Sequence, residues 1–398
     1  MDFMESIYKK KYYLGEFMNT FELIAPCHFG LEAVLKREII DMGYEISCVE
    51  DGKVTFFGDA EAICRGNIFL RTAERVLLKT AKFKAVTFTE LFDQTKDVPW
   101  EEFIPKDGKF WVTKANSVNS QLYSSSDIQS IVKKAMVERL KSKYNIEWFE
   151  ENGNDYPVRV TIIKDEVTIG IDTTGDSLHK RGYRPLAGKA PISECLAAAL
   201  IMLTPWNKDR ILVDPFCGSG TFPIEAAMMA ANIAPGLNRS FTAQKWDNII
   251  GKKEWDAVFK EARDNIDLNV VTDIQGYDSD KDIIKIAKQN AVNAGVDKLI
   301  HFQQRDVKDL SHPKKYGFLI TNPPYGERME EKADLPPIYK ILGQQFKKLD
   351  EWSAYIITSY EETEKYFGRK ADKNRKLYNG MIKTYFYQYL GQKPPKKK

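Results

Sequence analysis

The chain has 398 residues, enough for two or three domains that each bury an apolar core. Apolar residues make up 43% and charged residues 29%, as in soluble globular proteins, and the formal charge of +3 does not by itself indicate a polyanionic partner. Five cysteines without a CxxC pair and four scattered histidines argue against a disulfide framework and a zinc site. No apolar stretch is long enough to cross a bilayer, and the N-terminus lacks the apolar core of a signal peptide. We therefore expect a cytoplasmic protein without a metal.

The N-terminal part predicts a small α+β unit. Residues 1–17 have no clear period and precede a second possible start at Met18, so they are given no role. The expected elements are strands at 20–26, 45–50 and 53–57 and an amphipathic helix at 30–42. We expect residues 19–59 to form a ferredoxin-like part.

Helices and strands alternate in the next segment, residues 60–172. The expected helices cover 60–70, 87–97 and 124–144, and the expected strands cover 75–83, 109–116, 158–164 and 166–172. Lysines and arginines recur here, and solvated faces would explain them as well as a binding surface would. The element order, with FKAVTFTELFD and VPWEEFIPKDGKFWVTKANSVNSQLYSSSDIQSIVKKAM, resembles the THUMP domain. That resemblance implies binding of structured RNA, with candidate contacts at Lys82, Lys84, Lys114 and Lys133.

Residues 173–190 predict a linker that contains the basic run HKRGYR. The run could be no more than a charged linker. Because it directly precedes the next domain, Lys180, Arg181 and Arg184 are candidates to contact RNA phosphates or to cap a cofactor. Pro191 is expected to open a helix that continues to Leu203.

The most informative stretch is RILVDPFCGSGTFPIEAAMMAA, residues 210–231. A short apolar strand ends at Asp214, a glycine turn follows, and an alanine-rich helix begins, so backbone N–H groups face the crevice beyond the strand. Pro223 follows Gly220-Thr-Phe, so the third glycine of a dinucleotide-binding fingerprint is missing, and this disfavours NAD as the ligand. An acid before the loop suits a sulfonium better than a pyrophosphate, so we expect S-adenosylmethionine. The expected contacts in this loop are Asp214, Phe216, Cys217, Gly218, Gly220 and Thr221.

Three further strands each end in an acid or an amide. The strands at 274–277, 300–304 and 316–321 lead to Asp278, Asp306 and Asn322. Alternation with helices predicts a parallel doubly wound sheet whose ligand crevice lies at these ends. Asp278 can accept hydrogen bonds from ribose hydroxyls and Asp306 one from an adenine amine. The expected cofactor contacts at these ends are Asp278, Ser279, Asp306, Val307 and Asn322.

The rest of this domain, residues 191–391, is expected to hold a helix at 254–269 and strands at 354–359 and 383–390. Residues 392–398 read as a disordered basic tail.

Asn322-Pro323-Pro324-Tyr325 is the candidate catalytic loop. The exocyclic nitrogen of a base is a poor nucleophile because its lone pair is delocalised into the ring. The Asn322 side-chain carbonyl and the Pro323 backbone carbonyl can accept its N–H groups and orient the lone pair toward a methyl donor. Pro324 stiffens the turn, and Tyr325 offers a ring on which an extruded base can stack. A rigid structural loop is the alternative explanation of this motif.

DPFCGSGTFPIEAA and TNPPYGERM, behind a THUMP-like segment and HKRGYR, are together similar to the THUMP-containing class I RNA guanine-N2-methyltransferases, including the N-terminal half of the large-subunit ribosomal RNA enzyme RlmL. The resemblance implies an α/β fold: a Rossmann-like class I methyltransferase domain with a doubly wound sheet, preceded by an α+β ferredoxin-like/THUMP module. It also implies methylation of guanine in structured RNA, ribosomal RNA first. Alternatives are a DNA or RNA adenine N6-methyltransferase and a non-catalytic RNA-binding or ribosome-assembly factor, with a nicotinamide dehydrogenase a distant third.

Overall fold

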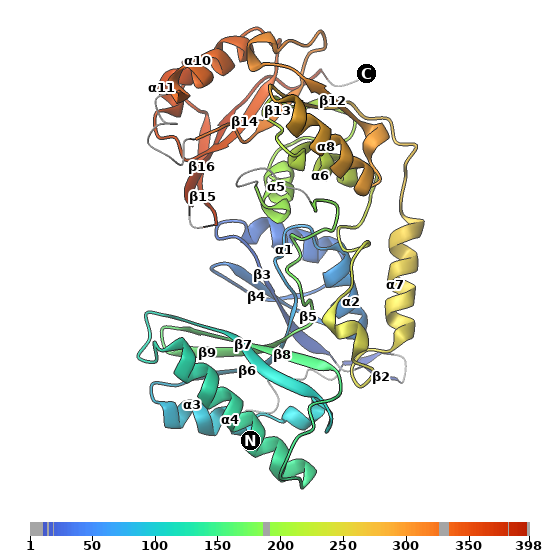
Figure 1. Cartoon of the computed structure of the whole chain (residues 1–398), viewed down its shortest axis with the longest axis vertical. Coiled ribbons are helices and arrows are strands. Elements are labelled where there is room, and N and C mark those ends of the chain that lie inside the picture. Colours follow the sequence, from blue (N-terminus) through green and yellow to red (C-terminus); the bar gives the residue numbers. More distant parts are fainter. Residues whose placement is uncertain are drawn as a thin grey trace. The chain divides into compact units, whose positions relative to one another are not determined.

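The computed structural model describes residues 11–13, 16–18, 20–185, 192–325, 334–380 and 382–395. The chain divides into two compact units, and neither is a continuous segment (Figure 1). Unit 1 takes the residues up to Cys27 together with 36–178 and 240–261. Unit 2 takes residues 28–35 and 179–239 and those from Ala262 onward.

Unit 1 is built on one seven-stranded sheet with the order β4-β5-β3-β6-β9-β8-β7. Its strands are β3 (Phe21–Pro26), β4 (Ile46–Glu50), β5 (Lys53–Gly58), β6 (Leu77–Lys84), β7 (Lys109–Val118), β8 (Asp155–Ile163) and β9 (Glu166–Asp172). All neighbours in this sheet are antiparallel except β7 and β8. The two N-terminal domains expected from the sequence therefore share a sheet, and their boundary at residues 59 and 60 stays a proposal.

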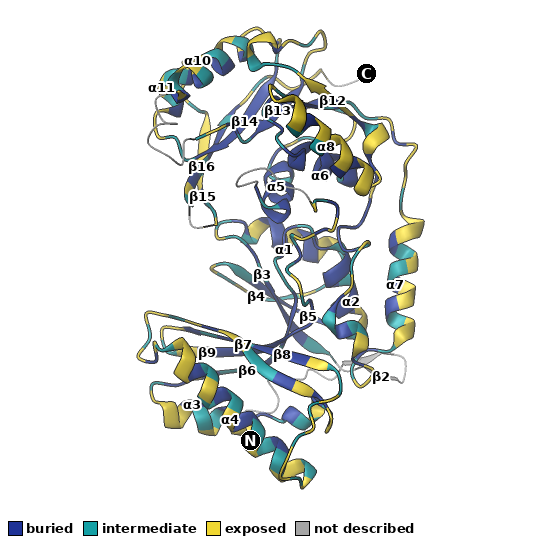
Figure 2. Ribbon diagram, in the orientation of Figure 1, coloured by how far each residue is buried: buried dark blue, intermediate teal, exposed yellow. Residues whose placement is uncertain are grey.

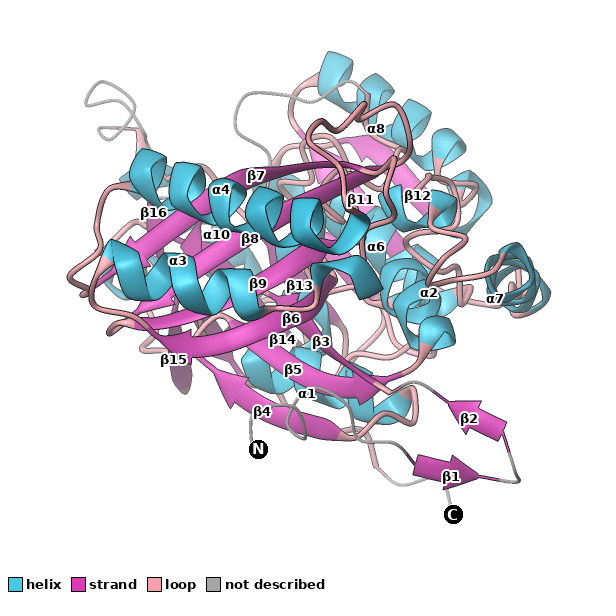
Figure 3. Ribbon diagram, turned by 90° about the horizontal axis from the view of Figure 1, so that it is seen from below, coloured by secondary structure: helices cyan, strands magenta, loops and turns pink. Residues whose placement is uncertain are grey.

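Helices cover one face of the β6-β9-β8-β7 part of this sheet, namely α3 (Phe88–Asp97) and α4 (Ser125–Tyr144) (Figure 3). The buried positions of α4, Ile128, Val132, Ala135, Met136 and Leu140, recur at helical spacing. β8 alternates, since Val158, Val160 and Ile162 are buried between the partly exposed Arg159 and Thr161. Two further helices, α1 (Glu32–Asp41) and α2 (Ala60–Phe69), complete the N-terminal region.

Unit 2 contains a second seven-stranded sheet with the order β12-β11-β10-β13-β14-β16-β15. Its strands are β10 (Leu212–Asp214), β11 (Ile274–Asp278), β12 (Ile300–Gln304), β13 (Phe318–Thr321), β14 (Ser353–Thr358), β15 (Lys373–Asn379) and β16 (Ile382–Tyr389). The first five are parallel and β16 is antiparallel to β14. The chain moves from β10 to β11 and β12 on one side and to β13 and β14 on the other. A topological switch point therefore lies between β10 and β13.

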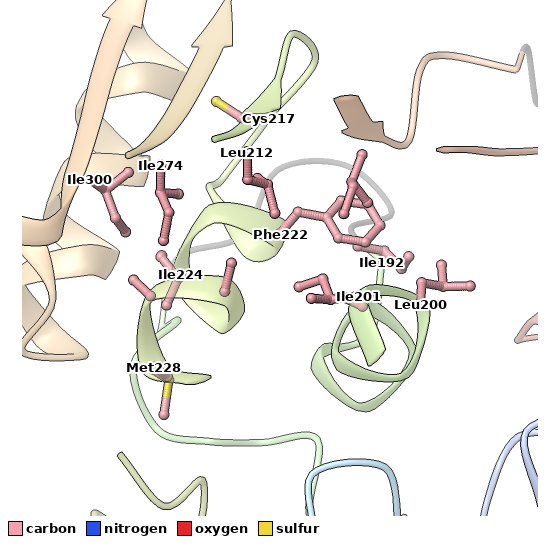
Figure 4. Close-up of a cluster of buried hydrophobic side chains, with 14 of the residues drawn as sticks. Ile192, Leu200, Ile201, Leu212, Cys217, Phe222, Ile224, Met228, Ile274 and Ile300 are labelled. Carbon is pink, nitrogen blue, oxygen red and sulfur yellow. The ribbon is translucent and has the colours of Figure 1, made fainter. Parts of the chain in front are cut away.

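The helices of unit 2 bury apolar side chains against this sheet. They are α5 (Glu194–Met202), α6 (Thr221–Ala230), α8 (Lys281–Asn293), α10 (Leu335–Phe346) and α11 (Thr363–Phe367). In Figure 4, Phe222 and Ile224 of α6 lie in the same buried cluster as side chains of α5, β11 and β12. Figure 2 shows α5 and α6 almost wholly buried, whereas the outer face of α8 is exposed. The helix that follows the glycine loop is thus part of the buried core of unit 2.

The expected fold class is confirmed, and several boundaries differ from the sequence expectation. The helix expected from Pro191 begins at Glu194 with Ser193 as its N-cap, while Pro191 itself lies outside the described residues. α7 spans Lys252–Asp264 and ends five residues before the expected Asn269. In the part of the chain that the structure describes, no helix combines the length and apolar character that crossing a bilayer requires.

Candidate cofactor and catalytic site

The glycine loop between β10 and α6 has the backbone geometry that its sequence predicts. Gly218 and Gly220 have φ angles of 51° and 91°, in the region that favours glycine. A Cβ at Gly220 would approach Phe302 and Ala287 to 3.0 and 3.2 Å, so this residue must be small. A Cβ at Gly218 would meet nothing within 4 Å. There is accordingly open space beside Gly218, where a ligand can approach the backbone.

Asp278, at the end of β11, reaches across to this loop. Its carboxylate accepts hydrogen bonds from the backbone N–H groups of Gly218 (3.1 Å) and Asp280 (3.0 Å). Burial raises the pKa of this carboxyl, although these two bonds act in the opposite direction. The carboxylate keeps lone pairs for a further donor, which fits the expected pairing with ribose hydroxyls.

Asp214 lies deeper than the sequence suggests. Only 1% of its surface is exposed, and its Oδ1 accepts from the Thr321 hydroxyl (2.6 Å) and from the Phe216 N–H (3.1 Å). Burial raises the pKa of Asp214 to about 7, and the charge of Asp278 acts in the same direction. Because Thr321 directly precedes Asn322, this hydrogen bond joins the glycine loop to the candidate catalytic loop. The expectation that Asp214 faces a sulfonium stays a prediction.

Asn290 was not expected as a site residue. Its side-chain amide is buried on α8 and donates to the Ser219 carbonyl (2.9 Å). A polar residue beside Ala287 and Ala291 on the apolar face of the helix is the signal that could have identified it. Asn290 therefore anchors the glycine loop to α8 through the Ser219 carbonyl.

The remaining expected cofactor contacts surround the same strand ends. Asp306 caps the short helix η4 (Val307–Asp309) through the Lys308 N–H (2.9 Å), and its partly exposed side chain lies 3.6 Å from the Lys308 ammonium. Phe216 and Val307 are partly buried against one apolar cluster. Cys217 is buried, Thr221 is the first residue of α6, and the Ser279 carbonyl accepts from Gln304. Their contact with a cofactor stays a prediction.

The candidate catalytic loop follows β13 at the switch point. Pro323 is buried, Asn322 and Tyr325 are partly buried, and Pro324 is exposed. The buried Tyr339 of α10 donates its hydroxyl to the Pro324 carbonyl (3.1 Å) and bonds the hydroxyl of Thr358, at the end of β14 (2.6 Å). The Asn379 amide donates to the Tyr325 hydroxyl (3.2 Å). Tyr339 lies on α10 and Asn379 ends β15, and the sequence analysis predicted neither of these elements.

The basic run HKRGYR supplies part of the interior of unit 2. Arg181 is 3% exposed, and its Nε lies 3.5 Å from Glu225 Oε1, which also accepts from the Tyr183 hydroxyl. Arg184 pairs with Glu194 (2.9 Å) and donates to Thr221 Oγ1 at the start of α6 (2.7 Å). These two side chains support α5 and α6, and the prediction that they bind RNA gains no support from their positions. Lys180 is exposed.

The other candidate RNA contacts lie in different layers of unit 1. Lys114 and Lys84 are exposed on β7 and β6, and Lys82 pairs with Glu166 and Glu50. The Lys133 ammonium donates to the Phe110 carbonyl and to Glu151, and it lies over the Phe110 ring. Lys133 is therefore already engaged within unit 1.

Unit 2 has the architecture of a Rossmann-like class I methyltransferase domain, with its candidate loops at the carboxyl ends of parallel strands. Three family models match the chain: an RlmL ferredoxin-like domain over residues 22–77, a THUMP domain over 85–172 and an RMKL-like methyltransferase domain over 181–388. The last covers more than half of the chain. The chain belongs to the RMKL-like methyltransferase family.

Curated relatives support this membership. The chain is 49% identical over 384 residues to "Putative RNA methyltransferase YpsC" of Bacillus subtilis, covering 96% of this chain and 99% of that protein. It is 34% identical over 381 residues to "Ribosomal RNA large subunit methyltransferase K/L" of Psychromonas ingrahamii. That match covers 92% of this chain and 49% of the relative, so the chain spans about half the length of the K/L protein.

Solved structures have the same fold. "SMU.472, a putative methyltransferase complexed with SAH" superimposes with a TM-score of 0.89 at 41% identity, covering 94% of this chain and 99% of that one. "Predicted N6-adenine-specific DNA methylase" from Listeria monocytogenes superimposes with a TM-score of 0.88 at 47% identity, covering 94% and 97%. The name of the Listeria protein refers to DNA, whereas the names of the Bacillus and Psychromonas relatives refer to RNA.

Proposed function

We propose that this protein is an S-adenosylmethionine-dependent RNA methyltransferase that modifies the exocyclic amine of a guanine, with ribosomal RNA as the first candidate substrate. The observation that carries the proposal is the hydrogen bond from Thr321 to Asp214, because it ties the Asn322 loop to the glycine loop at the switch point of the sheet. The names of the Bacillus and Psychromonas relatives and the THUMP match support RNA as the substrate.

The residues of unit 2 fit the cofactor. Open space beside Gly218, the N-terminus of α6 and the carboxylate of Asp278 suit a nucleoside with a charged amino acid chain. S-adenosylmethionine supplies the methyl group when it is bound. Asp278 would hold the ribose, and Asp306 would accept from the adenine amine.

The chain's own contribution to the chemistry lies in the Asn322 loop. The Asn322 side-chain oxygen and the Pro323 carbonyl would accept the two N–H groups of the target amine, orienting its lone pair and stabilising the positive charge that develops on nitrogen. Tyr325 would stack on the extruded base. Tyr339 fixes the Pro324 carbonyl, so the loop is held in place before the base arrives.

Adenine N6 methylation is the second candidate, because the same loop can orient an adenine amine and one solved neighbour is named for that activity. The proposal is tested by incubating the protein with RNA and labelled cofactor and then separating the nucleosides. Labelled N2-methylguanosine supports it. Labelled N6-methyladenosine alone would favour the alternative.

A further inference from the structure

The β6-β9-β8-β7 part of the unit 1 sheet has a second face, opposite α3 and α4, and that face is polar. The strand register places Lys114 of β7 beside Arg159 of β8, which lies opposite Gly170 of β9. In the next row, Asn116, Thr161 and Thr168 are aligned in the same way. A half-buried sheet normally presents such side chains to solvent, so the pattern alone carries no function.

Asp172, however, fixes two arginines on this face. Its Oδ2 accepts from Arg75 (2.7 Å) and from Arg159 Nε (2.8 Å), and its side chain is 3% exposed. Arg75 also donates to the Gly175 carbonyl. The two terminal nitrogens of Arg159 make no hydrogen bond to any described residue. A guanidinium held at one edge with donors left on the other is preorganised to bind an oxyanion.

These groups line a pocket of about 470 Å³ within unit 1. Arg75, Arg159 and Lys114 share it with Lys53 and with both polar and apolar residues of neighbouring strands. Asp51 and Glu74 also line it, and Glu74 accepts from Ser177, so the pocket carries charges of both signs. Its volume suits one nucleotide unit, not the side of a duplex.

The polar rows end in an apolar pair. Val118 and Ile163 are aligned across β7 and β8 and are 53% and 38% exposed. Val118 lies four residues along β7 from Lys114, which corresponds to about 13 Å. Apolar side chains at this distance from a phosphate site can cover the faces of bases, but only if those bases are unpaired.

We propose that this face binds an unpaired segment of the RNA substrate, with a backbone phosphate held by Arg75, Arg159 and Lys114 and adjacent bases covering Val118 and Ile163. The inference rests on the proposed function, which makes RNA the substrate. It assigns to the sheet face of unit 1 a contact that the candidate catalytic loop of unit 2 does not provide.

The test measures binding of a fluorescein-labelled 12-nucleotide unpaired RNA to the full-length protein at several salt concentrations. Lys114→Ala should lower the slope of log affinity against log salt by about 0.7, the value for one lost phosphate contact on a single strand. Arg159→Gln should weaken binding about tenfold, as expected for a lost charged hydrogen bond. Val118→Ser should weaken binding without changing the slope.

Lys134→Ala is the matched control, because Lys134 is an exposed lysine of α4, in the helical layer of the same unit. If Lys134→Ala reduced RNA affinity as much as Lys114→Ala, the RNA would bind on the helical face instead, and the proposal would be overturned. If a 12-base-pair duplex bound as tightly as the unpaired RNA, the proposed preference for an unpaired segment would be overturned. Lys114 is exposed, so its variant should fold even if Arg159→Gln does not.

Failure of this inference and failure of the proposed function give different results. Unchanged RNA binding by the Lys114 and Arg159 variants, with a wild-type protein that methylates RNA, removes the sheet site alone. A wild-type protein that methylates no RNA contradicts the proposed function, whatever the binding data show.

Discussion

At the scale of single residues, the carboxyls at the strand ends have different environments. Asp278 is partly buried and lies near the open space beside Gly218, whereas Asp214 is fully buried and bonded to Thr321. The sequence predicted the positions of both from strand ends. It could not predict the depth of Asp214 or its partner, because Thr321 lies 107 residues further along the chain. The sequence also did not indicate that Arg181 and Arg184 would pair with the buried Glu225 and Glu194.

The raised pKa of Asp214 makes stability depend on pH. Its folded-state value of about 7 exceeds the ordinary 3.8, so the folded protein holds this proton more tightly than the unfolded chain. The contribution of protonated Asp214 to the stability of the folded protein is fully present below about pH 4 and is lost as the pH rises through 7. The cofactor-free wild type should therefore lose melting temperature between pH 5.5 and 8 relative to Asp214→Asn, whose amide oxygen can still accept from Thr321. Parallel melting curves across this range would contradict the assignment.

Asp278→Asn should weaken cofactor binding. The amide oxygen can still accept from Gly218, but the charge that would pair with the ribose hydroxyls is lost, at a cost of about 1.5 to 3 kcal/mol. Titration calorimetry with S-adenosylmethionine measures this, and Asp282→Asn, an exposed residue in the first turn of α8, is the control. An unchanged affinity would mean that Asp278 only braces the glycine loop.

At the scale of elements, the parallel strands and the helix after the glycine loop follow from the sequence because their apolar periods and glycine turns are strong. Three elements of unit 2 were missed, namely α10, α11 and β15. α10 begins with Leu335, Pro336 and Pro337, and prolines suggest a break although they are tolerated in a first helical turn. β15 reads KNRKLYN and has no apolar alternation, because it is a charged edge strand.

The missed helix α10 contributes to the candidate site through Tyr339. Tyr339→Phe removes the donor to Pro324 and leaves that carbonyl and the Thr358 hydroxyl without this partner. We expect turnover to fall about tenfold with cofactor affinity unchanged, since a loop displaced by a fraction of an ångström orients the amine less well. Tyr360→Phe is the control, because the Tyr360 ring contacts Tyr339 but its hydroxyl bonds the exposed Glu362. Equal kinetics in both variants would remove the positioning role of Tyr339.

At the scale of the whole molecule, the sequence suggested a chain of successive domains, whereas each unit takes segments from separated parts of the chain. Residues 28–35 belong to unit 2, where Leu31 joins the buried cluster and the Gly30 carbonyl accepts from Arg375 (2.9 Å). Residues 240–261 belong to unit 1, where Trp246 stacks on Tyr156. Simple periodicity along the chain carries no information about such exchanges.

Deletion of residues 1–172 should therefore destabilise the remaining methyltransferase domain. The deletion removes Leu31 from the core of unit 2, and Trp246 loses its stacking partner Tyr156. Circular dichroism should therefore show a lower or broader melting transition than that of the full chain. A deletion product as stable as the full chain would contradict the assignment of residues 28–35 to unit 2. Single charge substitutions such as Lys114→Ala are consequently the better test of RNA binding.

We propose that Asn322 directs methyl transfer to a guanine amine. The most direct measurement incubates ribosomal RNA from cells lacking the gene with labelled S-adenosylmethionine and either wild-type protein or Asn322→Ala, followed by mass spectrometry of the nucleosides. We expect N2-methylguanosine with the wild type and none with Asn322→Ala, although the variant still folds and binds the cofactor. Wild-type-like turnover by Asn322→Ala, or a methylated nucleoside other than guanosine, would contradict the claim.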